Sequence, residues 1–347
     1  MNCYRFSIII VTWNAIHHLK NFLPSVIDTD YPDFEIIIAD NASDDGTKDW
    51  IEKSFPQVHH VMLDQNYGYC EGNNRAVPGS SGEILLFLNN DVEVTPNWLH
   101  PLNDLFQNKP TVAAVQPKIL SYRNKNEFEY AGAAGGFIDN YGYPFCRGRL
   151  FETVEEDHRQ YQTHGPIFWA SGASLAVRRS LFEKSGGFDE DFQFHMEEID
   201  LCWRLQNMGY SIHYVPESTV YHLGGGSLIT GSPRKITYNF RNNLIMLWKN
   251  ESTRNLWTRF PIRLLLDVLA GLKFFTSLHF SEFLAVARAY FQFIGMLPVI
   301  HKKRKQSIQY RKPHKSLSGK ISISLVWQYY ILGKRRFTEL PKTEEYL

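Results

Sequence analysis

The first half of the chain alternates between continuous apolar segments and segments whose apolar positions follow a helical spacing. The apolar segments are rich in Ile, Val and Leu and predict strands, and the amphipathic segments between them predict helices. Strands that are apolar at every position and separated by helices form a mostly parallel sheet covered on both faces, so we predict an α/β fold. Strands are expected over 6–13, 34–40, 58–63, 83–88 and 112–115, and helices over 16–27, 45–54, 69–77 and 96–107.

The second half of the chain is less regular. Residues 116–166 have no clear period and are rich in Gly and Tyr. Order returns after them, with a helix expected near 196–208 that ends at Gly209. Residues 255–300 are strongly apolar. The expected units are an α/β domain over 1–250 and a C-terminal helical, basic region over 251–347.

Polar residues follow the predicted strands at their carboxyl ends. Asn14, Asp40, Asn66 with Gly68, and Asp91 all stand at or just after such an end. Sheets of this kind bind ligands outside the carboxyl ends of their strands. A single Asn or Asp at a strand end is most often a turn residue. Four polar strand ends in succession favour the rim of a binding site.

Composition narrows the class of protein. The chain has 347 residues, 44% hydrophobic and 21% charged, which is typical of a globular protein. Its formal net charge of +1 gives no reason to expect nucleic-acid binding. The four cysteines show no C-x-x-C spacing, so no zinc or redox motif is indicated and a reducing compartment fits best. The first apolar run is too short for a signal peptide, so we expect a cytoplasmic protein.

Eight short motifs, in this order over about residues 6–245, resemble the family 2 glycosyltransferases. Within that family they are similar to bacterial rhamnosyltransferase-like enzymes of cell-surface polysaccharide synthesis. The resemblance implies a GT-A fold and an inverting transfer of a sugar from a nucleotide-diphosphate donor to a hydroxyl of a glycan or lipid-linked acceptor. The motifs are SIIIVTWN (7–14), IIIADNASDDGT (36–47), NYGYCEGNN (66–74), LNNDVEV (88–94), ASGASLAVRRS (170–180), GGFDEDF (186–192), HMEEIDLCWRL (195–205) and VYHLGGGS (220–227).

The resemblance assigns a donor site to the strand ends. Asp40 is expected to accept the imide N–H of uracil or thymine, although the segment after it is also rich in residues that cap helices. Rhamnose on thymidine diphosphate is the donor that the resemblance favours, and a hexose on uridine diphosphate is the alternative. Further donor contacts are expected from Thr12, Asn14, Asn66, Gly68, Asn74, Asn90 and Asp91.

A divalent cation is implied for the diphosphate. Asp91 occupies the last position of the family's Asp-x-Asp metal motif, and Asn89 stands where the first acid would be. Mg²⁺ or Mn²⁺ suits one carboxylate together with phosphate oxygens and water. His222 is the expected second ligand, or a donor to the diphosphate. A lone histidine after an apolar pair is otherwise a structural residue.

The motif over 195–205 carries the expected catalytic acids. Inverting transfer needs a base for the acceptor's proton, and Glu198 takes the family's base position, with Glu197 as the fallback. Asp200 is a third candidate, but with Arg204 it also forms an ordinary helix ion pair. The acceptor is expected to contact Asp189, Ser171 and Gly172.

Other functions fit the pattern less well. A glycoside hydrolase would also use two carboxylates but needs no nucleotide pocket. An oxidoreductase would need G-x-G-x-x-G after the first strand, and a nucleotidyltransferase a glycine-rich loop there; neither is present. A non-catalytic sugar-binding protein is the alternative from a different class.

The C-terminal region predicts contact with a membrane. The segments 264–275 and 283–300 are apolar but interrupted, whereas a spanning helix needs about 20 mostly apolar residues. Residues 301–320 hold eight Lys or Arg and no acid. We therefore expect peripheral, salt-sensitive attachment to an anionic surface, at the cytoplasmic face of the inner membrane. The alternative is that the two helices pack on the protein or on a dimer partner.

Overall fold

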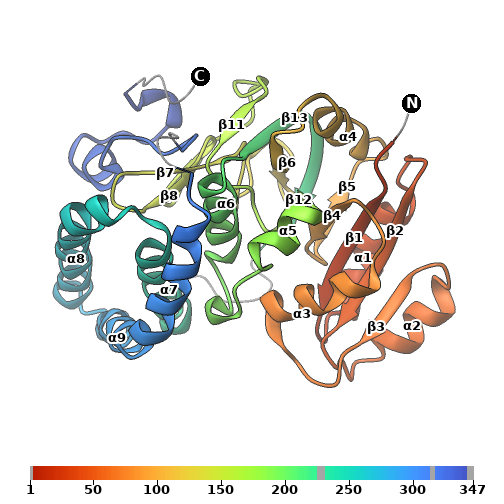
Figure 1. The fold of residues 1–347 in the computed structure, drawn as a ribbon, viewed down its shortest axis with the longest axis horizontal. Coiled ribbons are helices and arrows are strands. Elements are labelled where there is room, and N and C mark those ends of the chain that lie inside the picture. The colour runs from red at the N-terminus through yellow and green to blue at the C-terminus, as the bar shows by residue number, and fades with distance from the viewer. Residues whose placement is uncertain (1–2, 225–230, 313–316, 342–347) are drawn as a thin grey trace.

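The structure, a computed structural model, describes residues 3–224, 231–312 and 317–341. Its centre is a nine-stranded sheet in the order β11-β13-β6-β12-β4-β1-β2-β3, with β5 paired to β13 (Figure 1). The strands are β1 (Phe6–Thr12), β2 (Phe34–Asp40), β3 (His59–Met62), β4 (Ile84–Leu88), β5 (Val92–Val94), β6 (Val112–Ser121), β11 (Gly165–Ile167), β12 (Ser174–Arg178) and β13 (Ser211–His222).

Helices cover the sheet as the sequence pattern predicts. Strands β1, β2, β3 and β4 are parallel to one another. Along β1, Ile9 belongs to one buried cluster and Ile8 and Ile10 to the other, because successive side chains point to opposite faces. Both faces of the sheet are therefore shielded from water, which explains why these strands are apolar throughout. The helices of this part are α1 (Ile16–Ile27), α2 (Thr47–Ser54), α3 (Gly68–Ala76), α4 (Leu99–Asn108), α5 (Arg179–Ser185) and α6 (Glu197–Asn207).

The predicted α/β fold is confirmed, and its second half adds features that periodicity did not reveal. The strand expected over 112–115 continues to Ser121 as β6, and β12 pairs antiparallel with both β6 and β4. The stretch read as irregular contains a second, four-stranded sheet. Its strands are too short to show a period of two. They are β7 (Gly136–Ile138), β8 (Pro144–Cys146), β9 (Arg149–Leu150) and β10 (Thr153–Val154).

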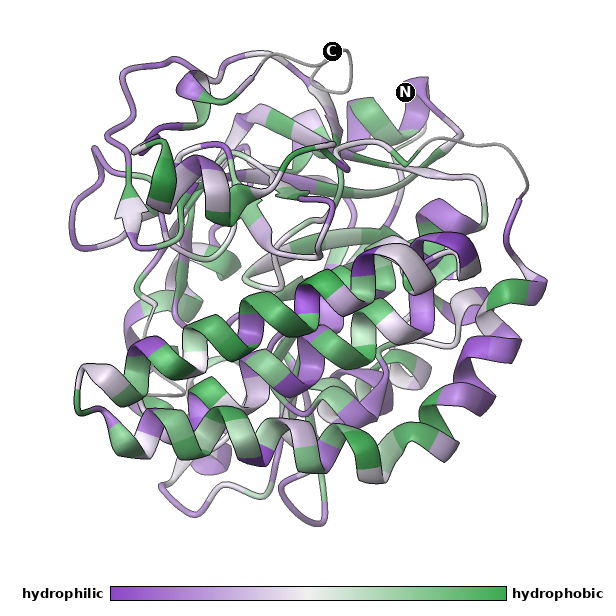
Figure 2. Cartoon of the chain, turned by 90° about the vertical axis from the view of Figure 1, so that its left-hand side faces the viewer, coloured by the Kyte–Doolittle hydropathy of each residue, from purple (hydrophilic) through white to green (hydrophobic). Residues whose placement is uncertain are grey.

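Three helices form the C-terminal side of the molecule: α7 (Pro233–Asn250), α8 (Thr253–Thr276) and α9 (Phe280–Gln309). Helix α9 packs against both α7 and α8 (Figures 1 and 2). Among the described residues, α9 is the one helix long and apolar enough to cross a membrane by length and composition. The division at residue 250 stays a prediction.

Only some of the Lys and Arg side chains in the basic segment after residue 300 are exposed. This corrects the interpretation of the segment as eight surface cations. Lys303 pairs with Asp189 and Asp191, and Lys320 pairs with Glu251. Arg304 and Arg311 donate to backbone carbonyls at the end of α7. Lys302, Lys305 and Lys312 remain exposed, and Lys315 lies outside the described residues. Long-range partners, which a local charge count cannot show, account for the difference.

Candidate active site

A cavity of about 1870 Å³ lies at the carboxyl ends of β1 and β4 and reaches across to α7 and α8. It brings together most of the residues selected from the sequence. On the donor side Asn90 Nδ2 donates to Thr12 Oγ1 at 3.2 Å. On the other side the first turn of α6 and the loop before β12 complete the wall. The selected residues in its lining are Thr12, Asn14, Asn66, Gly68, Asn90, Asp91, Ser171, Gly172, Glu197, Glu198 and His222.

Asp91 and His222 form a buried pair in this cavity. His222 Nε2 lies 3.1 Å from Asp91 Oδ1, because β5 and β13 pair antiparallel just beyond them. His222 Nδ1 lies 3.4 Å from Glu129 Oε2, a neighbour that sequence reasoning missed. Burial opposes charge on this imidazole, but Glu129 and Asp91 raise the pKa of His222 to about 10. Burial likewise opposes ionisation of Asp91, yet His222 holds its pKa below the ordinary value.

The chemistry of this pair fits a hard divalent cation. Glu129 on the Nδ1 side orients the ring so that Nε2 can bind a metal once its proton is lost. The described residues contain no cluster of three or more His, Cys, Asp or Glu arranged for a metal. The protein therefore offers one carboxylate and one imidazole, and the other ligands would come from diphosphate and water.

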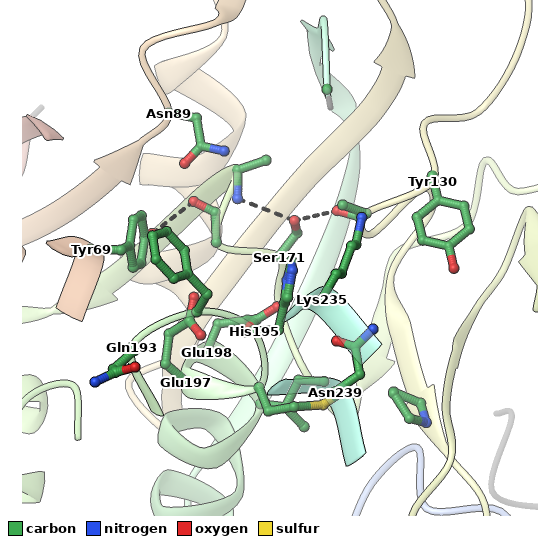
Figure 3. Close-up of a pocket in the computed structure, with 18 of the residues that line it drawn as sticks. Tyr69, Asn89, Tyr130, Ser171, Gln193, His195, Glu197, Glu198, Lys235 and Asn239 are labelled. Atoms are coloured by element: carbon green, nitrogen blue, oxygen red, sulfur yellow. Dashed lines mark hydrogen bonds between the residues drawn. The ribbon is translucent and has the colours of Figure 1, made fainter. Parts of the chain in front are cut away.

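Glu197 and Glu198 stand at the start of α6, beside Tyr69 and His195 (Figure 3). Each carboxyl has a buried Oε2 with no hydrogen-bond partner among the described residues. Burial raises the pKa of Glu198 to about 7, and burial together with Glu198 raises the pKa of Glu197 well above its ordinary value. A carboxyl that exchanges its proton near neutral pH suits general-base catalysis.

The loop before α6 is held in an unusual conformation. Gln193, His195 and Met196 have φ values of 59°, 67° and 75°. Such conformations persist only where neighbouring groups hold them. Asn242 Nδ2 donates to Phe192 O, Phe194 O and His195 O at 2.7, 2.7 and 2.9 Å.

Arg241 supports the same loop by donating to Asp191 O and Phe192 O. The sequence analysis did not identify this support of the loop by Arg241 and Asn242. Its only signal in the sequence is a run of polar residues, Arg241 to Asn243, directly before the apolar run 244–248.

Lys235 is a second residue that the sequence did not single out. It lines the cavity from the first turn of α7 and forms no salt bridge with the residues that the structure describes. Burial lowers the pKa of His195 to about 4, and the charge of Lys235 adds to that effect. Lys235 therefore places a cation in the cavity beside the loop before α6.

Four of the selected residues lie outside the cavity lining. Asp40 is fully buried, where it accepts from Ser43 N and lies 3.3 Å from His60 Nε2. Its neighbour Asn41 lines the cavity instead. Asn74 exchanges two hydrogen bonds with the Phe188 backbone, so its amide is already occupied. Neither Asp40 nor Asn74 lines the cavity, and the expectation that they contact the donor directly stays a prediction.

Asp189 and Asp200 belong to a buried ion network. Lys249 Nζ lies 2.5 Å from Asp189 and 2.8 Å from Asp200, and Asp200 also pairs with Arg204. Burial alone would raise the pKa of Asp189, but Lys249 and Lys303 hold it below its ordinary range. Both acids therefore stabilise the turn before α6. Both acids lie outside the cavity lining, and the expectations that Asp189 holds the acceptor and that Asp200 is catalytic stay predictions.

Comparison with known proteins places the chain in a family. Residues 7–186 match the family described as Glycosyl transferase family 2. The chain belongs to the family 2 glycosyltransferases. This glycosyltransferase is 30% identical over 275 residues to the N-acetylglucosaminyl-diphospho-decaprenol L-rhamnosyltransferase of Mycobacterium tuberculosis, covering 74% of this chain and 87% of that protein.

Solved structures share the GT-A fold of this glycosyltransferase. One is Staphylococcus aureus TarS 1–349 in complex with UDP-GlcNAc, with a TM-score of 0.56, 16% identity and coverage of 88% of this chain and 89% of that one. Another is the mannosyltransferase PcManGT from Pyrobaculum calidifontis in complex with GDP-Man and Mn²⁺, with a TM-score of 0.52, 16% identity and coverage of 89% and 84%. At these identities the likeness concerns the fold alone.

Proposed function

We propose that this glycosyltransferase transfers rhamnose from a thymidine-diphosphate donor, with inversion, to a hydroxyl of a lipid-linked sugar diphosphate. The observation that carries the proposal is the arrangement of the cavity. The same cavity is lined by the polar residues at the strand ends, by the Asp91–His222 pair and by Glu198, whose carboxyl has a pKa of about 7. The choice of sugar and acceptor rests on the name of the mycobacterial relative.

The residues divide the chemistry between them. Glu198 accepts the proton of the acceptor hydroxyl while that oxygen forms its bond to the anomeric carbon. The bond from that carbon to the diphosphate breaks on the opposite face, and the nucleoside diphosphate leaves with the electron pair. Asp91 and His222 would hold Mg²⁺ or Mn²⁺, which supplies charge neutralisation at the diphosphate when bound. Tyr69, bonded to Gly172 O at 2.9 Å, fixes the wall beside the base.

We further propose that the protein works at the cytoplasmic face of the inner membrane as a peripheral protein. Support comes from large apolar side chains exposed on α8 and α9. Because four of the eight cations are used inside the protein, attachment should depend more on apolar contact and less on salt than the sequence alone suggested.

The test is a transfer screen. Purified protein is incubated with dTDP-rhamnose, UDP-hexoses and GDP-mannose, each with a GlcNAc-diphosphate lipid and with Mg²⁺, Mn²⁺ or a chelator. We expect rhamnosyl product, and loss of product with the chelator. Transfer of a hexose from uridine diphosphate would replace the donor assignment. Donor binding without turnover of any donor would favour a sugar-binding protein instead.

A further inference from the structure

Helix α8 presents apolar side chains in two directions. One set lines the catalytic cavity and follows a spacing of three or four residues. A second set points away from the protein, and each of its members is 48–58% exposed. The cavity set is Leu266, Leu269, Ala270 and Phe274, and the outer set is Leu265, Val268, Leu272 and Phe275.

Leu269 belongs to both surfaces. It lines the cavity and is itself 53% exposed, so the apolar wall of the cavity continues to the outside of the molecule at this residue. A helix that packs only to build a fold buries its apolar stripe on one side. Here Gly271 and its neighbours pack towards α9, while the two remaining faces stay apolar.

The outer surface continues across the turn into α9. Leu278 in the turn is 74% exposed, and on α9 Leu284, Phe291 and Ile294 are 62%, 76% and 57% exposed. Large apolar side chains exposed together on two packed helices are typical of an interaction site. The opposite side of α9 is buried against the protein through Ala285, Val286, Ala289 and Phe293, so the helix is fixed in place as part of the folded domain.

Cations accompany the apolar wall inside the cavity. Lys235 and Arg234 come from α7, and Lys273 comes from α8, where it lies over the Tyr330 ring at 4.9 Å. The cavity therefore combines three features. The carboxyls of Glu197 and Glu198 suit a sugar hydroxyl, the cations suit an anionic linker, and the apolar side chains of α8 form a wall that continues to the outside of the protein. A sugar diphosphate joined to a long hydrocarbon carries these three chemistries in one molecule.

We propose that α8 is the route by which the acceptor's hydrocarbon chain leaves the catalytic cavity. The chain lies along the cavity set of α8 and passes Leu269 into a bilayer that contacts the outer sets of α8 and α9. The protein thereby draws its acceptor sideways from the membrane without lifting the lipid into water. This inference rests on the proposed lipid-linked acceptor and adds the surface that receives the lipid.

The experiment uses full-length protein and two acceptors with the same GlcNAc diphosphate. One carries a long polyprenyl chain in vesicles, and the other a short, water-soluble alkyl chain. Ala270→Trp fills the route with an indole. We expect it to raise the ratio of KM for the long acceptor to KM for the short acceptor at least tenfold. Met62→Trp, on an exposed site of β3, is the matched control and should leave that ratio unchanged.

A second variant tests the outer face. Leu265→Ser with Leu272→Ser should reduce flotation with phosphatidylglycerol vesicles several-fold, while the protein keeps its melting temperature. An unchanged KM ratio in Ala270→Trp would overturn the route. Concentration-dependent dimerisation through the outer face, without vesicle binding, would also overturn it. Failure of the wild type with both acceptors would instead refute the proposed function.

Discussion

Replacing Glu198 by Gln should slow the enzyme and stabilise its fold at the same time. The Oε2 of this carboxyl is buried and has no hydrogen-bond partner among the described residues, so ionising the group is costly in the folded protein. Its pKa is raised from 4.5 to about 7. At ~1.4 kcal/mol for each pKa unit, this difference corresponds to about 3 kcal/mol of stability.

The sign of the effect depends on pH. Below about 4.5 the carboxyl is protonated in both folded and unfolded states, and Glu198 costs nothing. Between 4.5 and about 7 the unfolded chain releases the proton and the folded protein keeps it, so stability falls as pH rises. Above 7 the loss is complete. A neutral Gln removes this dependence.

The assay is urea unfolding of wild type and Glu198→Gln at pH 5 and pH 8. The advantage of the variant should grow by about 2.5 kcal/mol between these values, because part of the loss has already occurred at pH 5. Turnover should fall by about 10²-fold or more, with donor affinity near that of the wild type. In the wild type, kcat/KM should rise with pH to a plateau above about 7, because the base must be ionised in the free enzyme.

Two results would refute this reasoning. An equal stability difference at pH 5 and pH 8 would show that the carboxyl is not held protonated by burial. An active Glu198→Gln beside an inactive Glu197→Gln would move the base to Glu197, whose pKa burial also raises.

Three further predictions follow from the cavity and its supports. Asp91→Asn should abolish transfer and Mn²⁺-dependent diphosphate binding measured by calorimetry, with little change in melting temperature; full activity of the wild type in a chelator would contradict this. Asn242→Leu removes three hydrogen bonds to the loop before α6 and should lower kcat at least tenfold and displace the acid limb of its pH profile, with donor Kd unchanged. A lower melting temperature alone would mean a purely structural role. Lys249→Met leaves Asp189 and Asp200 without their shared cation and should cost about 3–5 kcal/mol in urea unfolding, and a cost below ~1 kcal/mol would show that the network is not needed.

The sequence predicted the first half of the fold well because its signals are local. Strands β1, β2 and β4 are continuous apolar runs bounded by turn residues, and the helices between the strands repeat their apolar positions at a helical spacing. The short strands β7 to β10 were not predicted, because two or three residues cannot show a period.

The sequence identified site residues that stand in a local motif. It could not show which side chains are engaged by partners far along the chain. Asp91 and Glu198 both line the cavity. Asp189 and Asp200 look equally available in the sequence, yet Lys249 lies 60 and 49 positions away from them and occupies both. Asn242 is a buried amide on a helix, and only its three carbonyl partners reveal its role.

The most direct test of the central claim is the anomeric configuration of the product formed from dTDP-rhamnose and a GlcNAc-diphosphate lipid. Nuclear magnetic resonance of the purified product reports that configuration, and the same reaction with Glu198→Gln reports the role of the base. We predict a rhamnosyl product with configuration opposite to that of the donor, and almost none from the variant. A product that retains the donor's configuration, or equal product from the variant, would contradict the account.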